Sequence, residues 1–133
     1  MIRVMADFTL LNIVSAEAAA GMNVQNGAPV ALSIEGDIFK ATAVGATASA
    51  AFPAFYGSQI LDAQITGKLP VITANGYAFI TDQYDTGASW ALGADVTAKD
   101  GKWTVAASGE PVVGRVVKVP TANDATVGIY FKG

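Results

Sequence analysis

From residue 27 to its end, the chain consists of short apolar runs separated by glycine, asparagine, aspartate and proline. This pattern is typical of β-strands joined by tight turns, and its apolar residues do not recur with the longer period of an amphipathic helix. Turn residues recur roughly every 8 to 12 positions, which is the spacing found in small sandwiches and barrels. The pattern therefore predicts an all-β fold, a small antiparallel β-barrel or sandwich built of hairpins.

Four pairs of strands, each separated by a turn sequence, make up the predicted hairpins. The pairs are residues 30–34 with 38–41, 69–73 with 77–81, 93–97 with 102–106, and 112–119 with 126–132. The first three turns contain Gly36, Asn75-Gly76 and Asp100-Gly101, all of which favour chain reversal. Apolar residues alternate along 127–131, so one face of the last strand is expected to be buried.

Two stretches do not follow this pattern of short strands and turns. Residues 1–26 are expected to form an N-terminal arm, and residues 27–133 the β-barrel or sandwich domain. Within the arm, Ala16–Gly21 is the best candidate for the one short helix, with Ser15 as its N-cap and Gly21 as its C-cap. The second stretch, Ala41–Gly57, combines small residues with aromatic ones and is expected to be a long loop or a closely packed connection.

The N-terminal arm is dense in large apolar side chains. Such a strand can pair with the sheet of a neighbouring subunit or fold back onto its own core, and the sequence leaves both possibilities open. If it crosses over, each well-buried large side chain contributes roughly 1.5 to 3 kcal/mol before ordering costs. The residues expected at interfaces are Ile2, Val4, Phe8, Leu10, Leu11 and Ile13 of the arm, and Phe52, Phe55 and Tyr56 of the second stretch.

Composition narrows the range of partners. Of the 133 residues, 52% are hydrophobic and 14% are charged, whereas about 25% are charged in a typical domain. One domain of this size buries a real core, and part of the remaining apolar surface is expected to contact another chain. The 8 basic residues are scattered and the net charge is -3, so no direct nucleic-acid partner is expected. No apolar run approaches about 18 residues, so no membrane-spanning segment is expected.

The chain has no His and no Cys. These residues supply the commonest general acids and bases, the thiolate nucleophiles and many metal ligands. The serines therefore have no histidine to activate them, and the glycines form no phosphate-binding loop. We expect a protein that is not an enzyme, with no catalytic, metal-binding or cofactor-binding residues.

Clustered carboxylates offer alternative functions. Glu35 with Asp37, and Asp95 with Asp100, have the residue types of a glycosidase pair, but both pairs lie on predicted turns, where water solvates them. The segment Asp82–Gly87 has the carboxylates of a calcium loop without its spacing, and is interpreted as an acidic turn. An enzyme is thus the least favoured class of function.

Several segments from Gly27 onward resemble the small cement, or head-decoration, proteins of tailed bacteriophages. The segments are Gly27–Leu32 with Gly36, Gly93–Thr97 with Gly101, Val113–Val116 and Val127–Phe131, together with Ala51–Gly57, Asp62 and Thr66–Lys68. Residues 1–26 fall outside this resemblance.

The resemblance implies a β-barrel or β-tulip-like body that forms a homotrimer and binds the major capsid protein on the outer surface of the virion. Such trimers lie at three-fold or quasi-three-fold positions of the head and clamp neighbouring capsid subunits against internal DNA pressure. The family has no catalytic residues and no cofactors to carry over. A trimer on a three-fold axis engages three sites at once, so weak contacts are strengthened by effective concentration.

A second class of function is also open, a carbohydrate- or receptor-binding β-module of a phage fibre or tail. Trp90 and Tyr84 are the residues expected to form its stacking platform, since aromatic rings offer an apolar face with a polar edge. The alternative for each of them is a place in the core or in an interface.

Overall fold

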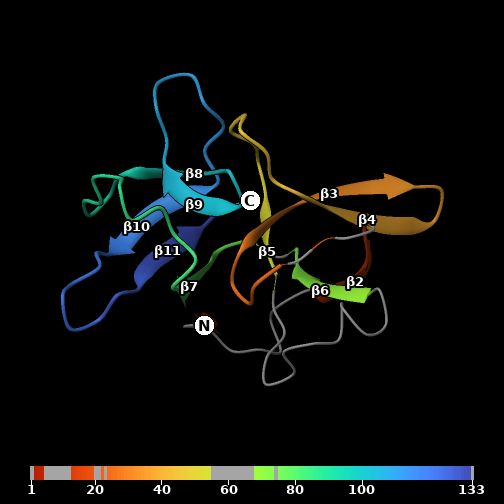
Figure 1. The fold of residues 1–133 in the computed structure, drawn as a ribbon, viewed down its shortest axis with the longest axis horizontal. Coiled ribbons are helices and arrows are strands. Elements are labelled where there is room, and N and C mark those ends of the chain that lie inside the picture. Colours follow the sequence, from red (N-terminus) through yellow and green to blue (C-terminus); the bar gives the residue numbers. More distant parts are fainter. Residues whose placement is uncertain are drawn as a thin grey trace.

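The computed structural model describes residues 2–4, 13–19, 22, 24–54, 68–73 and 75–132. These residues form eleven β-strands in two sheets, and no helix (Figure 1). The strands are β1 (Ile2–Val4), β2 (Ile13–Ala18), β3 (Pro29–Glu35), β4 (Ile38–Ala43), β5 (Phe52–Pro53), β6 (Lys68–Ile72), β7 (Tyr77–Thr81), β8 (Asp95–Lys99), β9 (Lys102–Val105), β10 (Gly114–Lys118) and β11 (Val127–Phe131). The predicted all-β fold is therefore confirmed.

The larger sheet has six strands in the order β1-β7-β11-β10-β8-β9, and every neighbouring pair is antiparallel. The large side chains at alternate positions of β7 and β11 are buried, and the register that places Phe79 opposite Ile129 brings them to the same side of the sheet. The outer edge of β9 is covered, because the Asp85 amide donates to the Trp103 carbonyl over 2.8 Å and the Trp103 amide donates to the Gln83 carbonyl over 3.1 Å.

The smaller sheet has five strands in the order β5-β3-β4-β2-β6. Strand β2 runs parallel to β4, and the other neighbours are antiparallel. Ala54, directly after β5, bridges Val71 of β6. The two edges of this sheet therefore meet, and the sheet is nearly closed into a small barrel.

Two apolar clusters fill the interior. The larger one is centred on the fully buried rings of Trp103, Phe79 and Phe131, with 5.5 Å between the centroids of Phe79 and Trp103. The smaller one lies inside the five-stranded sheet and consists of Ala16, Val30, Ala41, Ala54, Leu69 and Val71. Phe52 packs against both clusters, and its ring lies 5.9 Å from that of Phe131. The two sheets thus share one continuous apolar interior.

The Gly27 carbonyl joins the two sheets by two buried hydrogen bonds. The Gly27 carbonyl, just before β3, accepts a hydrogen bond of 2.8 Å from the Trp103 indole and one of 3.1 Å from the Thr81 hydroxyl. Both donors belong to the six-stranded sheet and both bonds are buried. Buried polar groups need such partners, so these bonds fix how the start of β3 meets the larger sheet.

Three of the four predicted hairpins are confirmed, those formed by β3 with β4, β8 with β9, and β10 with β11. Gly36 has a φ of +62° at the first position of a two-residue turn, as in a type II′ turn. Asp100 and Gly101 have φ values of 53° and 73°, which are the two positive values of a type I′ turn. In these hairpins the local turn residues dictate both the reversal and the register.

The predicted hairpin of 69–73 with 77–81 is wrong. Both strands exist, but β6 pairs with β2 in the smaller sheet, whereas β7 pairs with β1 and β11 in the larger one. Gly76, with a φ of 75°, donates its amide to the Phe131 carbonyl over 2.8 Å. The turn therefore passes the chain from one sheet to the other. Leu69 of β6 packs in the smaller cluster, and Ile72 of β6 packs in the larger one with Phe79 of β7.

The short helix predicted over Ala16–Gly21 is also wrong for residues 16–18, which belong to β2. Ala16 is fully buried and pairs with Leu69, and the Ala19 amide continues the pairing by donating to the Ala41 carbonyl. Alanine favours helix locally, but burial between two strands outweighs a preference of well under 1 kcal/mol per residue. Residues 20 and 21 lie outside the described residues.

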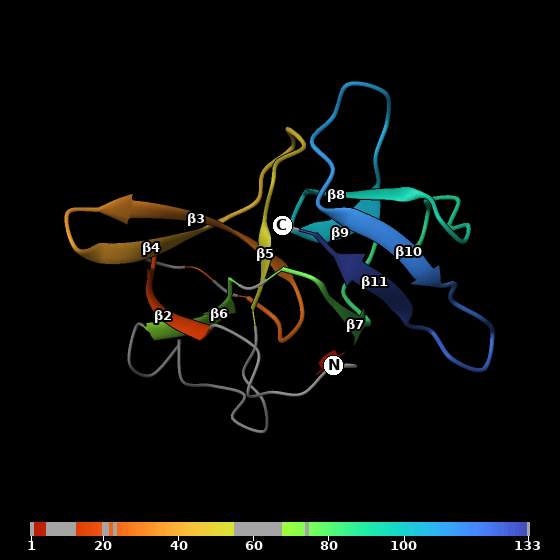
Figure 2. The same ribbon diagram turned by 180° about the vertical axis from the view of Figure 1, so that it is seen from behind.

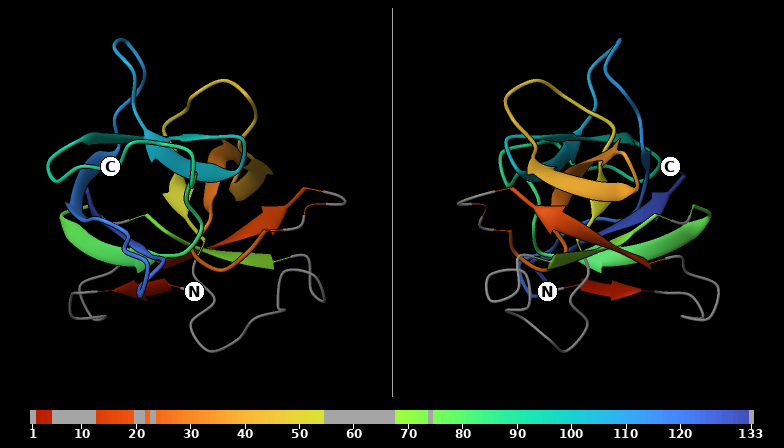
Figure 3. Two further views of the ribbon diagram at one scale, coloured as in Figure 1. Left: turned by 60° about the vertical axis from the view of Figure 1, so that its left-hand side comes forward. Right: turned by 90° about the vertical axis from the view of Figure 1, so that its right-hand side faces the viewer.

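The described parts of the N-terminal 26 residues belong to the two sheets. Strand β1 (red in Figure 3) lies alongside β7, and β2 lies between β4 and β6. The proposed boundary after residue 26 therefore does not coincide with a boundary between the sheets. The stretch 41–57 was predicted as a loop or connection, but residues 41–43 complete β4 and Phe52–Pro53 form β5. Between them Val44 and Ala51 are buried and Ser49 bridges Ala98, whereas residues 45–47 are exposed.

Candidate interaction surfaces

Four of the residues expected at interfaces serve the sheets or core of their own chain. Ile2 is buried in the larger cluster and pairs with β7. Val4 and Ile13 lie in β1 and β2, which pair with β7 and β6 of the same chain. Phe52 packs between the two clusters. Phe8, Leu10, Leu11, Phe55 and Tyr56 lie outside the described residues. The described strands of the arm thus fold back onto their own chain.

Exposed large apolar side chains mark other places where a partner can bind. Among the described residues these are Ile34, Ile38, Leu92, Val112, Val117 and Tyr130. The first two lie at the end of the β3–β4 hairpin, and the other four lie on or beside β10 and β11. Figures 1 and 2 show the hairpin projecting from one end of the molecule, with β10 and β11 at the other end. The exposed apolar surface is therefore divided between two ends.

The first surface is the hairpin tip, which we define by Ile34 and Ile38. Ile34 is directly opposite Phe39, on the face that carries the fully buried Val30 nearer the base of the hairpin. Exposure rises along this face to 67% at Ile34, so the apolar stripe extends beyond the core. Ile38 pairs with Glu35 and so lies on the other face. The tip consequently presents apolar side chains on both faces.

Acidic side chains lie at and near the hairpin tip. The Lys40 ammonium lies 3.5 Å from the carboxylates of both Glu17 and Glu35. The charge of Glu35, followed by the hydrogen bond and charge of Glu17, raises the pKa of Lys40 above its ordinary value. Asp37 lies in the turn and forms no ion pair with the described residues. Two carboxylates thus share the Lys40 ammonium, and Glu17 is also in register with Lys68 of β6.

The second surface is the β10 face, which we define by Arg115, Val117 and Tyr130. Arg115 and Tyr130 are directly opposite each other, on the side of the sheet away from the core. Val117 lies over Gly128, because a Cβ atom built on that glycine would be 3.4 Å from the Val117 methyl group. Leu92, which is 70% exposed, lies in the turn before β8, a neighbour of β10. This side of the sheet combines apolar side chains with one guanidinium.

Basic side chains outnumber acidic ones around the β10 face. Arg115 lies 3.6 Å from Asp95, and Lys118 lies 3.3 Å from Asp124. Lys132 follows β11 two residues after Tyr130, is exposed, and forms no ion pair with the described residues. Three cations therefore accompany two carboxylates, a local charge of about +1.

The acidic segment 82–87 forms a turn held by its own carboxylate. Asp85 accepts a hydrogen bond of 2.9 Å from the Gly87 amide and one of 3.1 Å from the Thr104 hydroxyl. The Trp90 indole donates to the Asp85 carbonyl over 2.9 Å, and its ring meets that of Tyr84 edge to face at 5.7 Å. Among the described residues no three potential ligands are grouped as for a metal ion. Tyr84 and Trp90 are thus brought together edge to face, and both pack against the larger core cluster, as in the alternative considered for them.

The other carboxylate pairs are not arranged as glycosidase pairs. Asp95 begins β8 and Asp100 follows its end, so the two are about 16 Å apart along the strand, beyond the limit of about 9.5 Å for that chemistry. Glu35 is occupied by Lys40, and Asp37 lies in the turn. In neither pair do the two carboxylates therefore face each other across a cleft.

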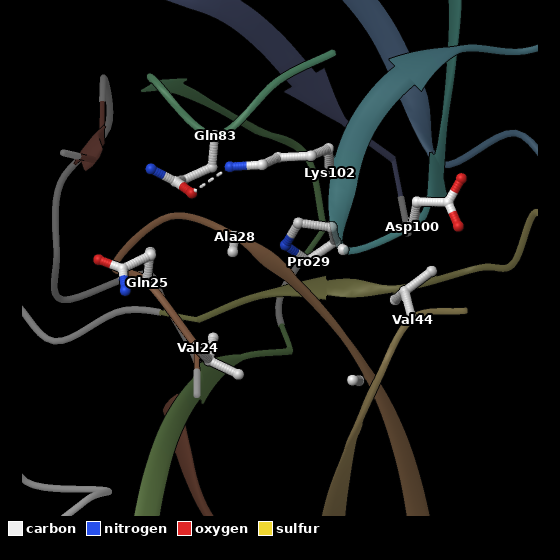
Figure 4. Close-up of a pocket in the computed structure, with 10 residues that line it drawn as sticks. Val24, Gln25, Ala28, Pro29, Val44, Gln83, Asp100 and Lys102 are labelled. Carbon is white, nitrogen blue, oxygen red and sulfur yellow. Dashed lines mark hydrogen bonds between the residues drawn. The ribbon is translucent and has the colours of Figure 1, made fainter. Parts of the chain in front are cut away.

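A cleft of about 230 Å³ lies between the two sheets. Pro29 and Val44 line it on one side, and Asp100 and Lys102 of the β8–β9 turn on the other (Figure 4). The Lys102 ammonium donates to the Gln83 side chain over 2.8 Å. The sequence did not predict this cleft, because it arises where the two sheets meet. Its polar groups form no nucleophile and base pair, and we assign it no chemistry.

Sequence reasoning also missed the six exposed apolar residues. A signal for the hairpin tip was present, since Ile34 and Ile38 flank Gly36-Asp37 closely. Residues beside a two-residue turn lie at the end of a hairpin, where a core rarely reaches. No comparable signal marked Val117 and Tyr130, because alternation along a strand does not say whether another layer covers the outer face.

No helix in the described part of the chain is long and apolar enough to cross a membrane. Comparisons with protein-family models, with curated proteins and with solved structures give no match to this chain.

Proposed function

We propose that the protein is a capsid decoration, or cement, protein of a tailed bacteriophage. It binds the outside of the icosahedral head as a trimer at three-fold or quasi-three-fold positions, where it clamps neighbouring major capsid subunits against internal DNA pressure. In this role it acts by contact alone, without catalysis or a cofactor.

The observation that carries the proposal is the division of exposed apolar surface between two ends of one small β-body. A protein that holds others together needs at least two separate contact surfaces, and the hairpin tip and the β10 face meet that need. The resemblance of the segments from Gly27 onward to head-decoration proteins adds to this support.

The energetics suit a multivalent clamp. Burying Ile34 and Ile38, which are partly exposed in the chain, contributes about 1 to 2 kcal/mol each, which is too weak to hold a lone copy on a shell. In a trimer, three sets of contacts act together at high effective concentration. Binding is therefore expected to depend strongly on the trimer and weakly on any one side chain of the shell.

The test is binding to heads that lack a decoration protein, assembled from the major capsid protein of the same virus. The purified chain is mixed with these heads and sedimented. We expect saturable co-sedimentation, with a fixed ratio to capsid subunits, and a higher temperature of head disruption. Ile38→Asp reduces binding at least tenfold, whereas Thr47→Asp, an exposed position at neither end, leaves it unchanged. Heads that bind no wild-type protein at micromolar concentration contradict the proposal.

A second candidate function is favoured by one specific observation, the contact between Tyr84 and Trp90. These partly buried rings pack against the larger core cluster and lie beside the Asp85 turn, and an aromatic ring offers an apolar face on which a sugar can stack. A carbohydrate- or receptor-binding module requires glycan binding that Trp90→Ala abolishes and Trp90→Phe largely keeps. A glycan array without hits, together with binding to heads, rejects this candidate.

A further inference from the structure

Asparagine is followed by glycine at two places among the described residues, Asn26-Gly27 and Asn75-Gly76. In such a pair the backbone nitrogen of the glycine can attack the side-chain carbonyl carbon of the asparagine, and glycine hinders this attack least because it has no Cβ atom. An N–Cγ bond forms and the Cγ–Nδ2 bond breaks, so ammonia leaves with the proton of the glycine amide. Water then opens the succinimide ring to aspartate or isoaspartate. Both pairs are therefore candidate sites of spontaneous deamidation.

The fold occupies the attacking nitrogen in both pairs. The Gly27 amide donates to the Ala54 carbonyl and the Gly76 amide donates to the Phe131 carbonyl, each over 2.8 Å. A donated N–H is harder to deprotonate, because losing the proton sacrifices the hydrogen bond and leaves a negative nitrogen beside a carbonyl oxygen. The held nitrogen is also kept from turning toward the asparagine side chain. Reaction at either asparagine thus requires the hydrogen bond of the following glycine to open first.

The Gly27 bond belongs to the junction between the two sheets. Gly27 and Ala54 are buried, and the Ala54 amide donates in turn to the Ala28 carbonyl over 2.9 Å. The Gly27 carbonyl accepts the two buried hydrogen bonds from Trp103 and Thr81. Freeing the Gly27 amide therefore disrupts the contact between the sheets, and its opening free energy is close to that of unfolding the whole chain.

The Gly76 bond lies at the end of a strand ladder instead. Gly76 precedes the first residue of β7 and Phe131 is the last residue of β11, so their hydrogen bond is the terminal one between these two strands. Asn75 and Gly76 are both exposed, and they belong to the connection between β6 and β7. A bond in such a place opens with the loss of few other contacts. The Gly76 amide is therefore released at times while the rest of the chain stays folded.

We propose that Asn75 is a deamidation site of the folded protein, gated by the hydrogen bond from Gly76 to Phe131, and that Asn26 is protected until the chain unfolds. The reaction needs no co-reactant except water, and it places a carboxylate in the connection between the two sheets. Where the product is isoaspartate, the backbone gains a methylene group and the Gly76 amide is displaced from the Phe131 carbonyl. This chemistry is independent of the proposed function.

The test follows deamidation of the full chain in a mildly alkaline buffer, with and without denaturing urea, by peptide mass spectrometry. Tryptic cleavage after Lys68 and Lys99 leaves Asn75 as the one asparagine of its peptide, and fragment masses locate the change at Asn26 in another. In urea the two sites are expected to react at similar rates, because glycine follows both. In the folded protein we expect Asn75 to react at least about tenfold more slowly than in urea, and Asn26 at least about a hundredfold more slowly than Asn75.

Two tryptophan variants separate local opening from global unfolding. Trp103→Phe removes one hydrogen bond from the Gly27 carbonyl and lowers global stability, so it is expected to speed reaction at Asn26 about thirty- to a hundredfold and at Asn75 less than about twofold. Trp90→Phe is the matched control, and is expected to speed Asn26 less than about fivefold. Circular dichroism confirms that both variants fold. Hydrogen exchange gives a second readout, in which the Gly76 amide is expected to exchange well before the Gly27 amide.

Three outcomes would overturn the proposal. If Asn75 reacts as fast in the folded protein as in urea, the Phe131 bond does not gate it. If Asn75 does not react in the folded protein, or reacts no faster than Asn26, the Gly76 bond does not open locally. If Trp103→Phe speeds both sites equally, or the Gly27 amide exchanges first, both sites open only through global unfolding.

Discussion

Replacing Trp103 by Phe probes the point at which the two sheets are joined. The Trp103 ring is fully buried between Phe79 and Phe131, and its indole donates to the Gly27 carbonyl over 2.8 Å. In Trp103→Phe that carbonyl keeps the Thr81 hydroxyl, so the loss is one hydrogen bond and not an orphaned acceptor. The lost bond costs about 1 kcal/mol and the space left by the smaller ring about 1 to 2 kcal/mol.

The expected loss of unfolding free energy is therefore about 2 to 3 kcal/mol. Urea denaturation measures it as a fall of about 1 to 2 M in the midpoint, with an unchanged slope. Trp90→Phe is the matched control, since the chain has 2 tryptophans and each variant keeps one as fluorescent reporter. The Trp90 hydrogen bond is exposed, and its loss costs under about 1 kcal/mol. Equal midpoints for the two variants would refute the account of how the sheets are joined.

Three further predictions concern stability. The Tyr77 hydroxyl is buried without a hydrogen-bond partner among the described residues, so Tyr77→Phe is expected to raise the unfolding free energy by about 1 kcal/mol, measured by urea titration. Burial raises the pKa of Tyr77, so wild-type stability should fall as the pH rises above the ordinary tyrosine value of about 10, and this fall should shrink in Tyr77→Phe. The hydrogen bond from the Lys99 ammonium, over 2.7 Å, lowers the pKa of Glu110. The contact therefore stabilises the fold above the ordinary carboxyl pKa, and this stabilisation is lost as the pH falls through the lowered pKa of Glu110. In an acid titration the unfolding free energy of Glu110→Gln should consequently fall less than that of the wild type. A Cβ atom at Gly114 would overlap the Tyr130 carbonyl, so Gly114→Ala should lower the melting temperature and cost about 1 to 3 kcal/mol; an unchanged melting temperature would contradict the register of β10 with β11.

The sequence predicted the elements that local turn chemistry determines. Gly36 and Asp100-Gly101 adopt the positive φ values that their turns need, and the hairpins around them form as expected. Asn75-Gly76 was an equally strong turn signal, yet the strands beside it join different sheets. A turn residue says that the chain changes direction, but the partner of each strand depends on contacts far away in the sequence.

The same limit applies to β2. Ala16 has the local preference of a helix, but it is buried between strands that follow much later in the chain. Parallel pairing with β4 joins segments more than twenty residues apart, and no short window of sequence contains that information.

The interaction residues were predicted less well than the fold. Apolar character alone pointed to Ile2 and Phe52, which the chain uses in its own core. What separates them from Ile34 and Tyr130 is exposure, and exposure follows from how far each strand extends past the core and which face another layer covers. Both are properties of the assembled sheets.

The most direct test of the proposed function is an electron-microscopy reconstruction of heads with and without the purified protein. We expect added density on the outer surface at three-fold or quasi-three-fold positions, in which three copies fit and touch neighbouring capsid subunits. Density confined to the tail or fibres, or identical reconstructions with and without the protein, would contradict it.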